Sequence, residues 1–483
     1  MNNPLLFFNG IDLARTREKR SCYWRAPMRL GDFVDRLIPD QDRATQGRAA
    51  QGRAAQERAA QGRAVQGWDS LDQRDVIEGV RAEDLDSAGW GMIVHEREDP
   101  EILEALAPLR KLRGETAGDR YFRPLPFRDG DDVSSFLMRH GAGRGDANPR
   151  RLPYYLLIIG DPTRIPFSFQ CELDVSYAVG RLAFAEAAGY ERYAAGLAAW
   201  ERSPGQAAQR RLLFFGVDNG DRLTGLSGRY LIDPLAKALG EGIKGHGWKL
   251  KVQAADATKK RDLAALLEGP HPPSLLFSAG HGVTCSDDAE SRERLQGGLV
   301  CGDWRATEEI QRDHCYCGED LPTTADLRGC IHFQFGCFSA GTPEFDTCRY
   351  PTRPGRRLHE APFVADHARA MLKQGALAVI GHVDQAFQHA FLWDERVNEI
   401  DHFGSVLAKL MRGLPVGYAM EHLNRRYAHL AAVLMGRLFE PDPPHPEELK
   451  LRAWLAMQDA RNYVVLGDPA ARLKPPPATP DGT

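Results

Sequence analysis

Short apolar runs that end at glycine constrain the fold of this chain more than any other feature. One run spans 274–278 and leads into Ala279-Gly280-His281-Gly282, and another spans 331–335 and leads into Gly336-Cys337. An apolar run bounded by glycine is typical of a buried strand in a parallel sheet. Because chemistry in open α/β sheets gathers beyond the carboxyl ends of strands, we expect the imidazole and the thiol to lie at neighbouring strand ends.

Strand-like and helix-like patterns alternate from residue 90 onward, which predicts an α/β fold whose mostly parallel sheet is flanked by helices. The expected strands are 90–95, 154–159, 177–184, 212–217, 249–254, 274–278, 331–336, 376–381 and 462–466. The expected helices are 99–113, 185–202, 230–239, 259–267, 363–374, 404–412, 415–434 and 446–457.

The chain divides into four parts by composition. Residues 1–87 form an N-terminal extension that contains a five-residue Ala-Gln-Gly-Arg repeat over 44–68. On a helix, a five-residue step would spread the arginines over all faces and leave no apolar stripe, so the repeat is expected to be disordered. It would either have no function or serve as a basic tether or a cleavable, arginine-rich leash. We expect a first subdomain over 88–210, a catalytic subdomain over 211–475 and a flexible tail over 476–483.

Charge and cysteine content exclude several classes of protein. A formal net charge of −4 gives no indication that the chain as a whole binds nucleic acid or an anionic membrane. No apolar run is long enough to span a bilayer, and the start of the sequence lacks the pattern of a secretory signal. Nine cysteines at irregular spacing do not indicate a disulfide framework, so we expect a reduced, cytoplasmic protein.

Cys337 and His281 have the residue types of a nucleophile and its proton-transfer partner. The glycine after the histidine has no side chain, so the Gly282 N–H could approach a substrate carbonyl, with the Cys337 N–H as a second donor to the oxyanion. The alternative for each residue taken alone is structural: a buried small apolar cysteine and a packed histidine.

Gly280-His281-Gly282 and Phe335-Gly336-Cys337 resemble the motifs of caspase-like clan CD cysteine peptidases, especially the gingipain-type and CHAT-type branch. Segments 155–161, 180–181, 363–380 and 464–469 are similar to other parts of that catalytic unit, so the resemblance covers about 88–474. It implies a caspase-like sandwich of two subdomains and a cysteine endopeptidase of protein or peptide substrates. It further implies regulation, with a regulatory protein partner, in a bacterial defence or cell-death pathway. The alternative is a non-catalytic scaffold or sensor of the same fold.

The resemblance also implies roles for further residues. An acidic residue after the 212–217 strand would orient the histidine, with Asp218 nearest and Asp221 second. No acid stands at 225–229, where the arginine-selecting aspartate of gingipains would fall. Asp384 and Phe387 are the expected substrate-binding residues, with 287–288 as further acidic candidates.

The polar stretch 283–329 joins the two reactive strands and is expected to be an irregular substrate-binding or regulatory loop, acting with the N-terminal extension as a control element. His314, Cys315 and Cys317, with Cys301 and Cys330 nearby, lack the usual zinc spacing, so we expect surface thiols, no metal and no cofactor. The Gly-Asp-Pro segments at 160–162 and 467–469 lack a phosphate-loop pattern and are expected to be turns that end strands.

Overall fold

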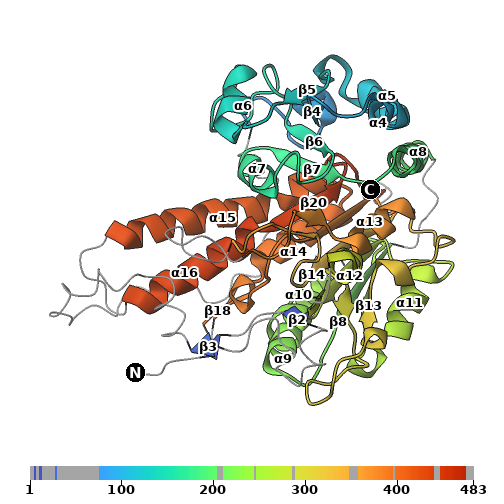
Figure 1. Cartoon of the computed structure of the whole chain (residues 1–483), viewed down its shortest axis with the longest axis vertical. Helices are drawn as coiled ribbons and strands as arrows, with labels where there is room; N and C mark the ends of the chain where they lie inside the picture. Colours follow the sequence, from blue (N-terminus) through green and yellow to red (C-terminus); the bar gives the residue numbers. More distant parts are fainter. Residues whose placement is uncertain are drawn as a thin grey trace, which may run out of the picture.

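The computed structural model describes residues 76–474 except 204–209, 244–245, 286–288, 348–356, 395–396 and 440–445, together with three short strands at 5–6, 10–12 and 28–29. The described residues form a ten-stranded sheet of order β5-β4-β6-β7-β20-β17-β14-β10-β8-β9 (Figure 1). Its strands are β4 (Trp90–His95), β5 (Leu125–Phe127), β6 (Tyr155–Ile159), β7 (Ala178–Leu182), β8 (Arg211–Gly216), β9 (Lys249–Val252), β10 (Leu275–Ala279), β14 (Ile331–Phe335), β17 (Ala378–His382) and β20 (Tyr463–Gly467).

The half of the sheet that contains β8, β10, β14 and β17 is built from parallel pairs. β10 runs parallel to β14, with Leu275 opposite Ile331 and Ala279 opposite Phe335. β8 and β10 are also parallel, as are β14 and β17, whereas β20 is antiparallel to β17. The prediction of an α/β fold with a mostly parallel sheet is confirmed, and the matched register places the segments after β10 and β14 at one edge.

Helices cover both faces of the sheet (Figure 1). On one side lie four helices in which α8 contacts the other three: α4 (Pro100–Ala105), α5 (Ala107–Ala117), α8 (Ala187–Arg202) and α13 (Asp366–Lys373). A second group on the other side is α10 (Asp233–Gly242), α14 (Asp401–Met411), α15 (Val416–Phe439) and α16 (Pro446–Arg461). The last two lie side by side and project from the body. Among the described residues, no helix combines the length and apolar character needed to cross a membrane.

The core extends through both expected subdomains, because strands from 88–210 and from 211–475 belong to one sheet. Packing begins before residue 88: Val76 is buried, and the hydroxyl of Tyr155 donates to the carbonyl of Ala82 at 2.5 Å. The repeat at 44–68 and the tail at 476–483 lie outside the described residues.

The segment 283–329 differs from the expected irregular loop. It contains β11 (Gly282–Thr284), α12 (Ala289–Leu295), β12 (Leu299–Val300) and β13 (Cys315–Tyr316). The three strands and β2 (Gly10–Asp12) form a second sheet of order β13-β12-β11-β2. This sheet has a small apolar core of its own, made by Val283, Leu295, Val300, Trp304, Ile310, Cys315 and Cys317. The expectation of an irregular loop was wrong because strands of only two or three residues leave no periodic pattern to detect.

Two expected helices also differ from the structure. The helix expected at 99–113 is divided at Leu106 into α4 and α5, with a proline in the first turn of α5. The helix expected at 363–374 begins only at Asp366, because Phe363–Val364 forms the short strand β16 against β15 (Gly341–Thr342).

Candidate active site

His281 follows β10 directly, and its imidazole is fully buried against a carboxylate. Nε2 of His281 lies 2.8 Å from Oδ2 of Asp221, whose side chain is 5% exposed. The ring also meets the indole of Trp304 edge-on, with the ring centroids 6.2 Å apart. A carboxylate on one imidazole nitrogen fixes the ring's orientation.

Asp221 is held in place by a second role, as the N-cap of α9 (Arg222–Ser227). Its Oδ1 accepts hydrogen bonds from the N–H groups of Leu223 at 2.8 Å and Thr224 at 3.0 Å. Burial by itself raises the pKa of this carboxyl, but the imidazole of His281 and the two amides outweigh it, so the pKa of Asp221 lies below its ordinary value. The side chain is therefore a carboxylate at neutral pH.

Asp218, the nearest acid to the expected position, does not supply this carboxylate. Its Oδ1 accepts from the N–H of Gly220 at 2.8 Å, two residues away within the same turn. Asp221 therefore stands where Asp218 was expected. The sequence carried a signal for this difference, because an aspartate just before a helix is an N-cap, whereas Asp-Asn-Gly is a turn that engages its own aspartate.

Residues from the 283–329 segment brace the loop that carries Asp221. The buried amide nitrogen of Asn219 donates to the carbonyls of Cys301 and Trp304, both at 3.0 Å. The N–H of Ala306 donates in return to the carbonyl of Asn219 at 2.9 Å. Sequence reasoning missed these positioning residues, because no motif links an asparagine to carbonyls more than eighty residues away.

Cys337 occupies a tight turn after β14. The next residue, Phe338, has φ of 57°, a left-handed conformation that a non-glycine residue adopts only when its surroundings impose it. The hydroxyl of Ser339 donates back to the carbonyl of Gly336 at 2.9 Å and accepts from the N–H of His382 at 2.9 Å. The turn is thereby tied to the neighbouring strand β17.

The backbone of Gly282 packs directly on the backbone of Cys337. A methyl group on Gly282 would lie 1.9 Å from the carbonyl oxygen of Cys337 and 2.9 Å from its nitrogen. Only glycine therefore fits after the histidine. This close approach brings the His281–Gly282 peptide and the turn that carries Cys337 together, as their positions in the sequence predict.

The thiol of Cys337 is covered in this conformation. Its Sγ accepts a hydrogen bond from the N–H of Ala386 at 3.2 Å, and neither Cys337 nor His281 has any exposed surface. The loop after β17 supplies that cover. A substrate can reach the two side chains only after a segment that covers them moves.

Asp384 and Phe387, the expected substrate-binding residues, are buried in the same loop. The carboxylate of Asp384 accepts from the hydroxyl of Thr347 at 2.6 Å and from its N–H at 2.9 Å. Thr347 and Val383 line a cavity of about 450 Å³ that includes Phe167, Phe345 and Arg461. Asp384 thus lies behind the wall of this cavity, while Phe387 is 2% exposed. Residues 287–288 lie outside the described residues.

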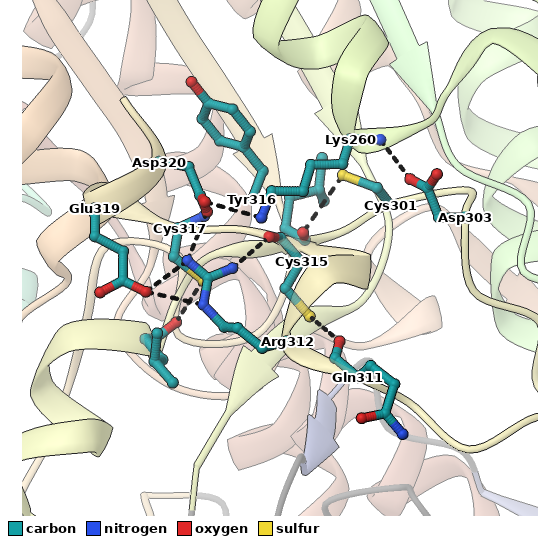
Figure 2. A network of polar contacts seen from close by, with 12 residues as sticks. Lys260, Cys301, Asp303, Gln311, Arg312, Cys315, Tyr316, Cys317, Glu319 and Asp320 are labelled. Atoms are coloured by element: carbon teal, nitrogen blue, oxygen red, sulfur yellow. Dashed lines mark hydrogen bonds and ion pairs between the residues drawn. The ribbon is translucent and has the colours of Figure 1, made fainter. Parts of the chain in front are cut away.

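The cysteines of the 283–329 segment are buried, contrary to the expectation of surface thiols. Figure 2 shows Cys301, Cys315 and Cys317 among the polar groups around Arg312. Their sulfur atoms lie near backbone carbonyls: Cys317 near Leu295 at 3.5 Å and Cys301 near Leu299 at 3.6 Å. Arg312 and Lys260 pair instead with the carboxylate of Asp320. Within the described part of the chain, no three His, Cys, Asp or Glu side chains are grouped to hold a metal ion.

Burial also keeps these thiols neutral. It raises the pKa of Cys317 to about 12, where the nearby Arg312 partly opposes it, and that of Cys330 to about 12. The pKa of Cys171, on helix α7 (Phe167–Leu173), is raised to about 11 by the same cause. Neutral thiols are poor nucleophiles, so these cysteines should react slowly with alkylating agents.

No protein-family model matches the sequence, and no curated protein matches it. Among solved structures, a chain described as a protease aligns with a TM-score of 0.46 and 12% identity, over 81% of this chain and 80% of its own. The complex of pro- and mature domains of Porphyromonas gingivalis RgpB gives 0.43 and 13%, over 80% of each chain. The Saccharomyces cerevisiae separase–securin complex gives 0.34 and 12%, over 66% of this chain and 16% of the other.

The chain is thus structurally similar to the gingipain RgpB, from the branch that its motifs resemble, and to separase, at low sequence identity. TM-scores below 0.5 assign neither a family nor an activity to it. The assignment of function depends on the site itself.

Proposed function

We propose that this protein is a cysteine endopeptidase in which Cys337 is the nucleophile and His281 the proton-transfer residue. The observation that carries the proposal is the packing of the His281–Gly282 peptide on the backbone of Cys337, with Asp221 2.8 Å from the imidazole. A thiol, an imidazole and an orienting carboxylate gathered at one edge of a parallel sheet form the constellation that acyl transfer requires.

Each group has a defined part in the proposed reaction. The thiolate of Cys337 attacks the scissile carbonyl and forms a tetrahedral oxyanion, which the N–H groups of Gly282 and Cys337 stabilise. Collapse of this intermediate breaks the C–N bond, and the imidazolium of His281 gives its proton to the leaving amine. Water then hydrolyses the thioester and frees the enzyme. Asp221 acts as a positioning residue through the imidazole.

The wider setting of this activity is also a proposal. Its substrates would be proteins or peptides, with Asp384 and Phe387 shaping the substrate site from behind the wall of the 450 Å³ cavity rather than by direct contact. The peptidase would act in the cytoplasm, in a bacterial defence or cell-death pathway, under the control of a regulatory protein partner. The burial of Cys337 and His281 in the resting chain supports such regulation.

Incubation of the full chain with a peptide library and with a peptidyl acyloxymethylketone tests the activity. Cleavage of peptides and attachment of the probe to Cys337 are expected, and both should be lost in Cys337→Ala. Probe attachment that persists in Cys337→Ala would remove Cys337 as the nucleophile. His281→Ala leaves the main-chain packing of residues 281–282 on Cys337 unchanged, so the variant should remain folded. It should lose peptide cleavage.

A second candidate function, a non-catalytic scaffold or sensor, is favoured by one observation. The thiol of Cys337 is buried and already accepts a hydrogen bond from Ala386. A scaffold would stay unreactive toward the probe under every condition in which it remains folded. A peptidase would react once the covering segments are displaced, so probe labelling of the folded chain separates the two.

A further inference from the structure

β11 carries the glycine next to the proposed proton-transfer residue, and both of its edges are occupied. One edge pairs with β12, with Gly282 opposite Leu299. The other edge pairs with β2, a three-residue strand from the N-terminal extension, in parallel and in the register Gly282 with Gly10, Val283 with Ile11 and Thr284 with Asp12. In Figure 1 this short blue strand lies against the half of the molecule that carries β8 and β14.

Hydrogen bonds to β12 show which backbone groups of β11 face β2. The N–H of Val283 donates to the carbonyl of Gly298 at 2.8 Å, and its carbonyl accepts from the N–H of Gly297 at 2.9 Å. Backbone groups of successive strand residues point to opposite edges. The N–H and carbonyl groups of Gly282 and Thr284 therefore point toward β2, and in a parallel ladder those of Ile11 lie between them.

This edge includes the N–H that the proposed mechanism uses. The Gly282 amide was assigned to the oxyanion, yet in the resting chain it faces a paired strand. β2 is the last strand of its sheet and is paired on one edge only, so it can be displaced without breaking the rest of the sheet.

We propose that the edge of β11 opposite β12 is a strand-addition site for an extended peptide, and that Gly10–Asp12 occupies it in the resting chain as an internal competitor of the substrate. Pairing by main-chain hydrogen bonds recognises any extended peptide that can run parallel to β11. Because β2 belongs to the same chain, its local concentration is high and the edge stays filled until β2 is displaced. The substrate role of this edge rests on the proposed function, whereas its occupation by β2 does not.

The full-length variant Ile11→Pro tests the proposal, with Ile11→Val as its matched control. Proline removes the N–H that faces β11, whereas valine keeps it. Hydrogen exchange at single-residue resolution should show at least tenfold faster exchange of the Gly282 and Thr284 amides in Ile11→Pro only. The Val283 amide, which bonds to β12, should be unchanged and is the internal control. Equal exchange of Gly282 and Thr284 in the two variants would overturn the pairing.

Use of this edge by a peptide is measured in parallel. A peptidyl acyloxymethylketone, whose peptide part has to pair with the edge that β2 occupies, should modify Cys337 at least fivefold faster in Ile11→Pro than in Ile11→Val, because the loop after β17 is the same in both, with the same variants carrying Cys337→Ala used to subtract other cysteines. A peptide with the sequence of residues 7–15 should restore the protection of Gly282 and slow the modification. Faster exchange without faster modification, or no effect of the peptide, would overturn the competitor role.

Failure of the proposed function has a different signature. Faster exchange and faster modification without cleavage of any peptide would end the peptidase assignment and leave the strand-addition site standing.

Discussion

The carboxylate of Asp221 has two structural roles: one oxygen lies 2.8 Å from Nε2 of His281, and the other caps α9. The cap fixes the carboxylate at the start of a helix, where the N-terminal end of the helix dipole also favours a negative charge. The imidazole therefore meets an anion whose position is set by the fold. A helix N-terminus thus orients the imidazole of His281, the proposed proton-transfer residue.

Asp221→Asn should lower kcat/KM by about 10- to 100-fold while leaving the chain folded. Asparagine caps a helix about as well as aspartate, so α9 keeps its first turn, but the imidazolium loses its anionic partner. Steady-state hydrolysis of a cleaved peptide measures kcat/KM in the variant and in the wild type.

Asp218→Asn is the matched control for that variant. Its carboxylate accepts a hydrogen bond within its own turn, so kcat/KM should change by no more than about twofold. Equal losses of kcat/KM in the two variants would mean that activity depends on the loop as a whole rather than on the carboxylate that contacts His281.

Gly282→Ala should reduce activity to the level of Cys337→Ala. The added methyl group would lie 1.9 Å from the carbonyl oxygen of Cys337, and backbone atoms cannot give way as a flexible side chain can. Gly225→Ala, on helix α9, meets nothing within 4 Å and should keep full activity. Peptide hydrolysis by the two variants checks the prediction, and an active Gly282→Ala would show that the two backbones do not touch.

Arg113→Met should lower the free energy of unfolding by about 3–5 kcal/mol. The guanidinium is buried and donates to Asp468 at 2.6 Å and to Glu201 at 2.7 and 2.8 Å, so methionine would leave two carboxylates without their cation. Urea unfolding measures the change. Arg202→Met, which removes an exposed pair with Glu115, is the control and should have little effect.

Acidification from pH 6.5 toward pH 4 should destabilise the chain. Burial lowers the pKa of His367 to about 4 and that of His389 to about 3, where neighbouring arginines add to the effect. Below about pH 6.5 the unfolded chain binds protons at these histidines while the folded chain does not, so protons favour unfolding. Each histidine contributes a slope of up to about 1.4 kcal/mol per pH unit in this window.

Urea unfolding of His367→Phe at pH 6.5, 5.5 and 4.5 checks this slope. The variant should lose less stability on acidification than the wild type, because one proton-binding group has left the unfolded state. His271→Gln, at an exposed position, should follow the wild type. A slope that is the same in all three proteins would exclude His367 as a source of the acid sensitivity.

Much of the fold could be read from local pattern. Buried strands such as β6 and β10 are continuous apolar runs, and their glycine ends set their boundaries to within one or two residues. The second sheet could not be read in this way. Its strands β11, β12 and β13 have two or three residues each, which is too short for any period to emerge, and they exist because they pair with one another.

By itself, the sequence determined the strand–helix alternation and the placement of His281 and Cys337 after two apolar runs, because both depend on residues close together in the chain. Only the tertiary structure decided which acid meets the imidazole, since Asp218 and Asp221 differ by three residues and the choice depends on how the helix start packs. The tertiary structure also paired Gly10–Asp12 with Gly282–Thr284. Pairing between segments some 270 residues apart depends on backbone hydrogen bonds, which leave no mark on the identity of either segment.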